Sequence, residues 1–114
     1  MKNVRLLVSF VAGSVLLGAT ALAAVDKKAE RAWKAKCAAC HGQTGKGDTD
    51  KGKELKVEDV TAGKYHSKKD SELKKAILDG VKVDGKEVMP PYKNEFTPEQ
   101  AEALITYTRN TFKK

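Results

Sequence analysis

Cys37-Ala38-Ala39-Cys40-His41 is the stretch that decides how this 114-residue chain folds. Successive residues of a helix are rotated by about 100°, so Cys40 lies about 60° to one side of Cys37 and His41 about 40° to the other. Two thiols and an imidazole therefore share one face. Both sulfurs can then bond to the edge of one porphyrin while the imidazole binds its iron. The motif C-x-x-C-H thus predicts covalent attachment of one haem c through Cys37 and Cys40.

Two other kinds of site use similar residues. A C-x-x-C pair can form a redox disulfide of the thioredoxin type, but that motif occurs beside a βαβ unit, which this sequence does not show. A closed zinc site needs four ligands, and the two cysteines, His41 and His66 would provide them only through chance spacing. The residues around the motif decide among the three interpretations.

Residues 1–23 have the pattern of a secretory signal peptide. Lys2 and Arg5 precede an apolar run to Leu22 without an acidic residue, and Ala21-Leu22-Ala23 is a small-x-small cleavage pattern. The alternative is an N-terminal membrane anchor, although Gly, Ser and Thr in the run weaken it as a spanning helix. We expect cleavage after Ala23 and a periplasmic, soluble protein with no stable membrane insertion. Export fits the haem, because c-type attachment is expected outside the cytoplasmic membrane.

Residues 24–114 form one small domain. Loss of the two basic residues of the signal peptide lowers the formal charge from +7 to +5, so the mature chain stays basic. A domain of this size rarely buries a sufficient core without a disulfide, a metal or a cofactor. Its large apolar side chains are few, and a covalent haem would complete the core. We expect the chain to fold poorly without it.

Three main helices with long loops predict an all-α fold. The first helix runs from Asp26, as N-cap, to Cys40. Its apolar residues fall on one stripe: Ala29, Ala32, Trp33, Cys37 and Cys40. The second follows Asp70 as N-cap and stops at Gly80. The third begins at the capping box Thr97-Pro98-Glu99-Gln100 and continues to about Phe112.

The segments between these helices are expected to be mostly irregular. Residues 42–63 are rich in glycine and charge, which favours a loop over a cofactor with at most a short helical turn between Gly52 and Val60. Residues 81–88 alternate apolar and polar side chains about Asp84-Gly85, the signal of a two-residue hairpin. A lone hairpin is marginal in water, so it must pack against its neighbours.

Met89 is the second candidate ligand. It is the only methionine left once Met1 is removed, and it precedes Pro90-Pro91-Tyr92. A rigid Pro-Pro segment would hold the loop extended and limit the movement of the thioether, as an axial iron ligand opposite His41 requires. The alternative is a methionine that only fills the core.

A C-x-x-C-H motif followed 48 positions after its histidine by Met-Pro-Pro-Tyr, with a helix before it and a capped helix at the end, resembles the class I monohaem c-type cytochromes of small bacterial periplasmic type. The resemblance covers residues 26–113. It implies the small cytochrome c fold, with His41 as proximal and Met89 as distal ligand. It also implies a contact between the terminal helices, for which Ala29 and Trp33 would meet Leu104 and Tyr107.

The chain departs from this family in one respect. Members often carry a proline after the motif whose carbonyl accepts the other N–H of the proximal histidine, and here no proline lies between His41 and Pro90. Another carbonyl between Gly42 and Thr61 must then orient the imidazole, or it is less firmly held.

Two polar residues before the second helix have open roles. His66 could replace Met89 and give a bis-histidine iron of lower potential, or it is an ordinary surface residue of a hydrophilic run. Tyr65 could donate a hydrogen bond to a haem propionate, although packing is the commoner role of one tyrosine in a polar loop.

The basic charge has two interpretations. Lysines that bracket the motif in sequence would steer an acidic partner toward the haem, or they only keep the protein soluble. Nucleic-acid binding is not expected, because the chain is exported and its charges are not interleaved with aromatic residues. We expect a monomer that meets larger redox proteins with an acidic docking face.

The predicted function is soluble one-electron transport, without enzymatic activity. If His41 and Met89 fill both axial positions, the iron has no open site for a substrate, and no further acid, base or nucleophile cluster is apparent. The alternative is a small haem enzyme or gas sensor in which Met89 is displaced.

Overall fold

The computed structural model describes residue 13 and residues 27–112. The expected signal peptide, apart from Gly13, and the Asp26 cap lie outside these residues. Within the described part of the chain, no helix is long and apolar enough to span a membrane.

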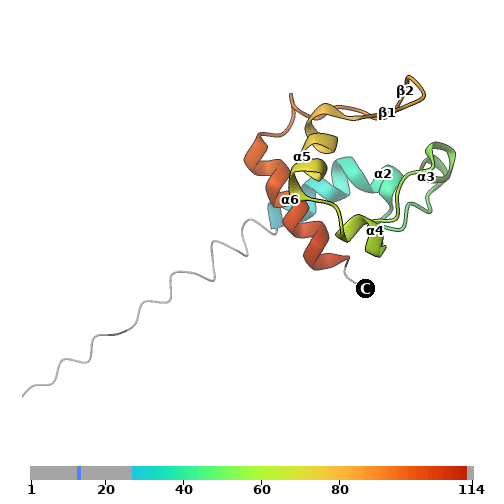
Figure 1. Cartoon of the computed structure of the whole chain (residues 1–114). Helices are drawn as coiled ribbons and strands as arrows, with labels where there is room; N and C mark the ends of the chain where they lie inside the picture. Colours follow the sequence, from blue (N-terminus) through green and yellow to red (C-terminus); the bar gives the residue numbers. More distant parts are fainter. Residues whose placement is uncertain (1–12, 14–26, 113–114) are drawn as a thin grey trace, which may run out of the picture.

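The domain is built mainly of helices, as the sequence predicts (Figure 1). An N-terminal helix covers residues 27–41. It is followed by α3 (Asp50–Leu55), α4 (Gly63–His66), α5 (Asp70–Asp79), the strands β1 (Val81–Val83) and β2 (Lys86–Met89), and α6 (Pro98–Thr111). The all-α prediction is confirmed, with one small hairpin in addition.

One wider turn interrupts the N-terminal helix. Residues 27–32 are α-helical, η1 (Trp33–Cys37) is a π-helix, and α2 (Ala38–His41) is α-helical again. The Ala38 N–H donates to the Trp33 carbonyl, five residues back, as in a π-helix. The extra residue moves the core position from Cys37 to Ala38, which is 6% exposed. Beyond Trp33 the predicted stripe therefore gains Ala38 as its buried residue, while Cys37 remains half-buried and packed against the core.

The N-terminal helix crosses α6, which it meets through its first half (Figure 1). Ala29, Trp33 and Leu104 belong to one buried cluster, and the ring of Trp33 lies 6.3 Å from the ring of Tyr107. Phe112 closes the cluster, with its ring centroid 4.9 Å from that of Trp33. The expected contact between the terminal helices is confirmed.

The helix ends follow the capping residues of the sequence closely. Lys69, rather than Asp70, is the N-cap of α5, so that prediction was wrong by one residue; Asp70 instead opens the helix, where its charge complements the helix dipole. The helix ends at Gly80, whose φ of 77° favours glycine. At α6, Thr97 accepts from the Gln100 N–H and Gln100 accepts from the Thr97 N–H, which confirms the capping box.

The predicted hairpin forms and carries Met89 at its end. Asp84 and Gly85 have φ values of 52° and 75°, as a type I′ turn requires. Val81 pairs with Met89 across the ladder. The methionine is thus fixed as the last residue of β2 rather than within a loop.

One short helix lies within the segment expected to be a loop, residues 42–63, and a second begins at its end. In α3, which starts slightly before the expected turn, Thr49 caps the helix by accepting from the Gly52 N–H at 2.9 Å. The sequence did not predict α4. Arg109 of α6 holds the exit of α4 by donating to the carbonyls of His66 and Lys68, at 3.1 and 2.7 Å, and to the Asp70 carboxylate at 2.8 Å.

Candidate haem-binding site

A cavity of about 560 Å³ lies between the N-terminal helix, α5, α6 and the hairpin. Its volume is within the range of roughly 300–1,000 Å³ that cofactor pockets occupy. Leu73 and Ile77 of α5 and Leu104 of α6 give it an apolar wall. The apolar face of α5 therefore lies along a cofactor-sized space, as its narrow sequence pattern suggests.

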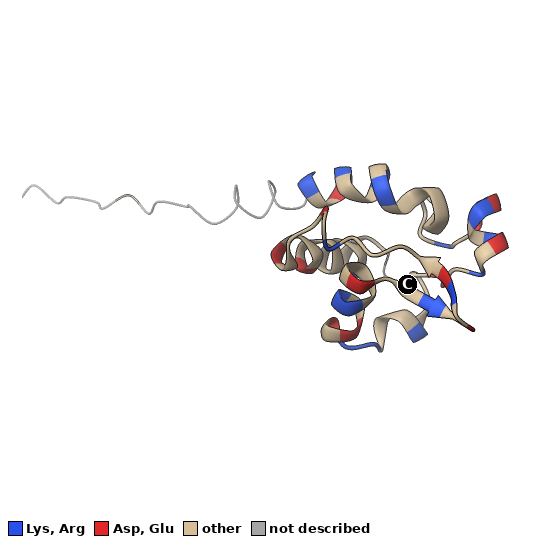
Figure 2. Ribbon diagram, turned by 90° about the horizontal axis from the view of Figure 1, so that it is seen from above, with Lys and Arg blue, Asp and Glu red and all other residues tan. Residues whose placement is uncertain are grey.

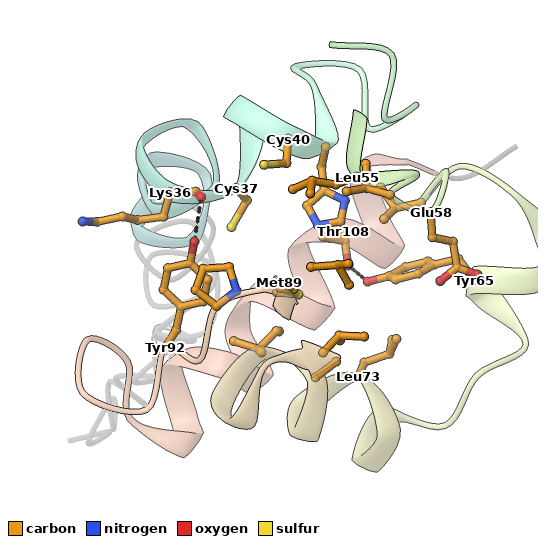
Figure 3. Close-up of a pocket in the computed structure, with 18 of the residues that line it drawn as sticks. Lys36, Cys37, Cys40, Leu55, Glu58, Tyr65, Leu73, Met89, Tyr92 and Thr108 are labelled. Carbon is orange, nitrogen blue, oxygen red and sulfur yellow. Dashed lines mark hydrogen bonds between the residues drawn. The ribbon is translucent and has the colours of Figure 1, made fainter. Parts of the chain in front are cut away.

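Cys37 and Cys40 face this cavity from the N-terminal helix (Figure 3). Both are free thiols and half-buried. Burial, and to a smaller extent the nearby Cys40, raises the pKa of the Cys37 thiol to about 11. The thiol stays protonated at neutral pH, which is unfavourable for a redox disulfide because thiolate is the reactive form. Thioether formation instead adds S–H across a vinyl double bond, and both thiols are placed to do so at one edge of a porphyrin.

His41 lines the same cavity beside the thiols. Its ring packs on Trp33, with centroids 5.5 Å apart and planes inclined by 34°. Burial lowers the pKa of His41, and the carbonyl and charge of Glu58 oppose this shift without reversing it. The imidazole is therefore neutral at pH 7, which is the form that binds a metal.

The buried polar atoms that lack a hydrogen-bond partner, among the described residues, all belong to residues that line the cavity. They are Trp33 Nε1, His41 Nδ1 and Glu58 Oε1. Such atoms are rare in folded proteins and mark places where a partner is missing. Two free thiols and an imidazole on one cavity fit a haem c, and the unpaired Nδ1 is the ring nitrogen that still needs an acceptor from the protein.

Met89 lines the cavity from the end of β2, and Figure 3 shows its side chain facing the same space as the two cysteines. The next residues pack on Gly80, where an added Cβ would lie 2.6 Å from the Met89 carbonyl oxygen and 2.9 Å from the Pro91 nitrogen. This close approach fixes the backbone that carries the thioether. The structure thus brings all four sequence-predicted site residues, Cys37, Cys40, His41 and Met89, to one cavity.

His66 and Tyr65 are placed away from the roles considered for them. His66 does not line the cavity; its Nε2 donates to the Phe112 carbonyl at 3.0 Å. The interpretation of His66 as an iron ligand is therefore wrong in this arrangement. Tyr65 does line the cavity, but its hydroxyl is bonded to the Thr108 hydroxyl at 2.7 Å. This hydrogen bond links α4 to α6, so the hydroxyl already has a protein partner.

Two further residues of the site were missed from the sequence. Glu58 brings its carbonyl close to His41, and its carboxylate pairs with Lys68 at 2.6 Å. Tyr92 lines the cavity and donates to the Lys36 carbonyl at 3.2 Å. The only signal for Tyr92 was its place directly after the Pro-Pro pair, and Glu58 gave none, because the group that matters is its backbone.

A zinc site finds no support in this arrangement. In residues 27–112, no three His, Cys, Asp or Glu side chains are grouped closely enough to hold a metal ion. His66 is engaged elsewhere, so the fourth ligand that a closed site would need is absent from the motif's surroundings.

Comparison with known proteins agrees with this geometry. Residues 24–107 match the protein family described as cytochrome c oxidase, cbb3-type, subunit III. A solved structure named KustC0563 c-type cytochrome superposes with a TM-score of 0.66 at 29% identity, over 75% of this chain and 98% of that one. No curated protein matches the sequence. With its C-x-x-C-H motif on a cofactor-sized cavity, the chain belongs to this family of c-type cytochromes, the haem proteins of electron transfer.

Proposed function

We propose that this chain carries single electrons between larger redox proteins, using one haem c bound covalently through Cys37 and Cys40. The observation that carries the proposal is one cavity bounded by two free thiols, the His41 imidazole and the only thioether of residues 24–114. A porphyrin iron cycles between ferrous and ferric states when bound, and the protein sets its potential through the axial ligands.

His41 and Met89 are the proposed axial ligands. The hairpin and the contact with Gly80 hold the thioether, and Trp33 holds the imidazole. With both positions filled by protein, no site is left open for a substrate. We therefore propose a carrier rather than an enzyme.

The Glu58 carbonyl is the proposed acceptor for the second N–H of His41. It already lies close enough to oppose the lowering of the His41 pKa, although Nδ1 does not meet hydrogen-bond geometry with any described partner. A small rotation of the ring on binding would complete the bond. Such an acceptor fixes the tautomer and raises the basicity of the ligand.

Met89→Ala tests the ligand assignment. Haem should remain attached, because both thiols are intact, but the sulfur-to-iron absorption band of the ferric protein should disappear. The reduction potential should fall by on the order of 0.1 V, part of the roughly 0.8 V that axial ligands span, since a thioether favours ferrous iron. Spectroscopy and potentiometry measure both.

The matched control is Val88→Ala, which shortens the preceding residue of β2, also half-buried on the cavity. It should keep the band and nearly the same potential. An unchanged band and potential in Met89→Ala would assign the sixth position to another group. Ready binding of carbon monoxide to the unsubstituted ferrous protein at neutral pH would favour the alternative, a haem enzyme or gas sensor with Met89 displaced.

We also propose that lysines at the cavity mouth steer an acidic partner. Figure 2 shows basic residues on the N-terminal helix and on the hairpin. The lysines that line the cavity are Lys36, Lys56, Lys68 and Lys86. Lys68 pairs with Glu58, and Lys34, near the motif, pairs with Glu30 at 2.7 Å. Lys86 is exposed and forms no ion pair within the described part of the chain, so its charge is available to attract a partner.

Lys86→Glu should slow electron exchange with an acidic partner about fourfold at low salt. Reversing one charge changes the interaction with a unit charge about 10 Å away in water by about 0.8 kcal/mol. The control is Lys28→Glu, which makes the same change at the far end of the N-terminal helix and should have a smaller effect. The rates of both variants should approach that of the unsubstituted protein as salt rises from about 0.01 M to about 0.15 M, because the Debye length then shrinks from roughly 30 Å to roughly 8 Å. Equal effects of the two variants, or no salt dependence, would assign the charge to solubility.

Export and processing complete the proposal. Cleavage after Ala23 would release a soluble periplasmic monomer of residues 24–114. The intact mass of the purified holoprotein should equal residues 24–114 plus one haem. A mass that retains residues 1–23 would support the membrane-anchored alternative.

A further inference from the structure

The segment that carries Met89, residues 89–95, is anchored by its backbone hydrogen bonds to one side of the cavity. Met89 pairs with Val81, and the Tyr92 and Lys93 N–H groups donate to the carbonyls of Ile77 and Leu78, at 3.0 and 3.1 Å. All of these contacts hold the segment to α5 and the hairpin. None of them fixes its distance from the helix that carries the two thiols.

Two polar contacts, within the described residues, join this segment to the N-terminal helix. The Tyr92 hydroxyl donates to the Lys36 carbonyl at 3.2 Å, as the dashed line in Figure 3 shows. Lys36 Nζ also lies 3.4 Å from the Glu95 carboxylate, but both side chains are about half exposed. Exposed ion pairs contribute little. The Tyr92 hydrogen bond is also exposed, but its donor belongs to a half-buried ring that lines the cavity, so its geometry is the better fixed of the two.

Tyr92 is well placed to hold a fixed spacing. Its ring stacks on Phe96 at 5.6 Å and 30°, which limits its rotation. Its acceptor, Lys36, lies in the π-helical turn next to Cys37. One hydrogen bond thus joins the helix that carries the two thiols to the segment that carries the Met89 thioether.

We propose that Tyr92 is a positioning residue, a latch that keeps the segment that carries Met89 closed over the cavity and so keeps the thioether on the iron. The inference rests on the proposed ligation by His41 and Met89. Without this hydrogen bond, the segment keeps its contacts with α5 but moves away from the N-terminal helix more often. A net hydrogen bond corresponds to roughly a fivefold change in an equilibrium constant, so the open fraction should rise by about that factor.

Imidazole is the probe for this opening. It binds the ferric iron only when Met89 has left, so its apparent affinity is proportional to the open fraction. In the full holoprotein, Tyr92→Phe should bind imidazole about fivefold more tightly than the unsubstituted protein. At saturating imidazole, the binding rate reports the departure of Met89, and it should rise as well.

Tyr65→Phe is the matched control. It removes one tyrosine hydroxyl from the lining of the same cavity and breaks its hydrogen bond to Thr108, but Tyr65 lies on the side opposite Tyr92 and, among the described residues, makes no hydrogen bond to the segment that carries Met89. Its imidazole affinity should stay near that of the unsubstituted protein. Equal affinities in Tyr92→Phe and the unsubstituted protein, or an equal rise in both variants, would overturn the latch. A missing sulfur-to-iron band in the unsubstituted ferric protein would overturn the proposed ligation, and the latch with it.

Discussion

The double variant Cys37→Ser/Cys40→Ser should emerge from the cell without covalently bound haem. A serine hydroxyl does not form the thioether, and both tethers are lost together. Either single variant should retain reduced attachment through the remaining thiol. The mass of the denatured chain shows directly whether haem is attached. Ala39→Ser is the control, because it introduces the same hydroxyl at an exposed position between the two cysteines.

The same variant should also lose most of its folded structure. The cavity of about 560 Å³ would be left without its cofactor. Even a cavity of about 150 Å³ made by a single substitution is costly to stability. Far-ultraviolet circular dichroism should therefore show a large loss of helix in the double variant but not in Ala39→Ser. Full covalent attachment of haem to the double variant would contradict the site assignment.

Gly52→Ala should destabilise the holoprotein by about 1–3 kcal/mol, the usual cost of overpacking. Gly52 of α3 presses against the end of the haem motif. A Cβ there would overlap the Cys40 carbonyl oxygen and lie 2.5 Å from the Gly47 carbonyl oxygen. Both obstacles are backbone atoms, so they cannot move aside as a flexible side chain would. This clash outweighs the gain of up to about 1 kcal/mol that alanine brings to a helix.

Gly63→Ala provides the comparison for that experiment. Gly63 also lies in a short helix, α4, but a Cβ added there meets nothing within 4 Å. It should leave the free energy of unfolding unchanged or slightly raised. Urea unfolding of the two holoproteins, fitted with one common m-value, measures the difference in their free energies of unfolding. Equal stabilities would show that α3 can move away from Cys40 without cost.

Features with strictly local causes were predictable from the sequence. The capping box at Thr97 and the Asp84-Gly85 turn depend on neighbouring residues, and both form as expected. The haem motif is also local, because its two thiols and imidazole are within five residues. Met89 could be singled out because no other methionine remains in residues 24–114.

Features that depend on distant contacts could not be predicted. The π-helical turn answers two different demands on one helix, packing on α6 and facing the cavity, and no residue type marks it. Tyr92 meets a carbonyl 56 positions earlier in the chain. The acceptor of the His66 imidazole, the Phe112 carbonyl, lies 46 positions away, so the sequence around His66 does not indicate it. The backbone carbonyl of Glu58 leaves no mark in the sequence at all.

The wide turn in the N-terminal helix also changes what a length change would mean there. One residue on an α-helix corresponds to about 100° of rotation, and the π-helical turn adds one residue between the half that packs on α6 and the half that presents the thiols. Removing one residue between Trp33 and Cys37 would place Ala38 four residues after Trp33, so the turn could close as an ordinary α-helix while both halves of the helix keep their present faces. A chain one residue shorter in this turn could therefore present the same motif and cross α6 in the same way from a regular α-helix, whereas a chain of the present length needs the wider turn to do both.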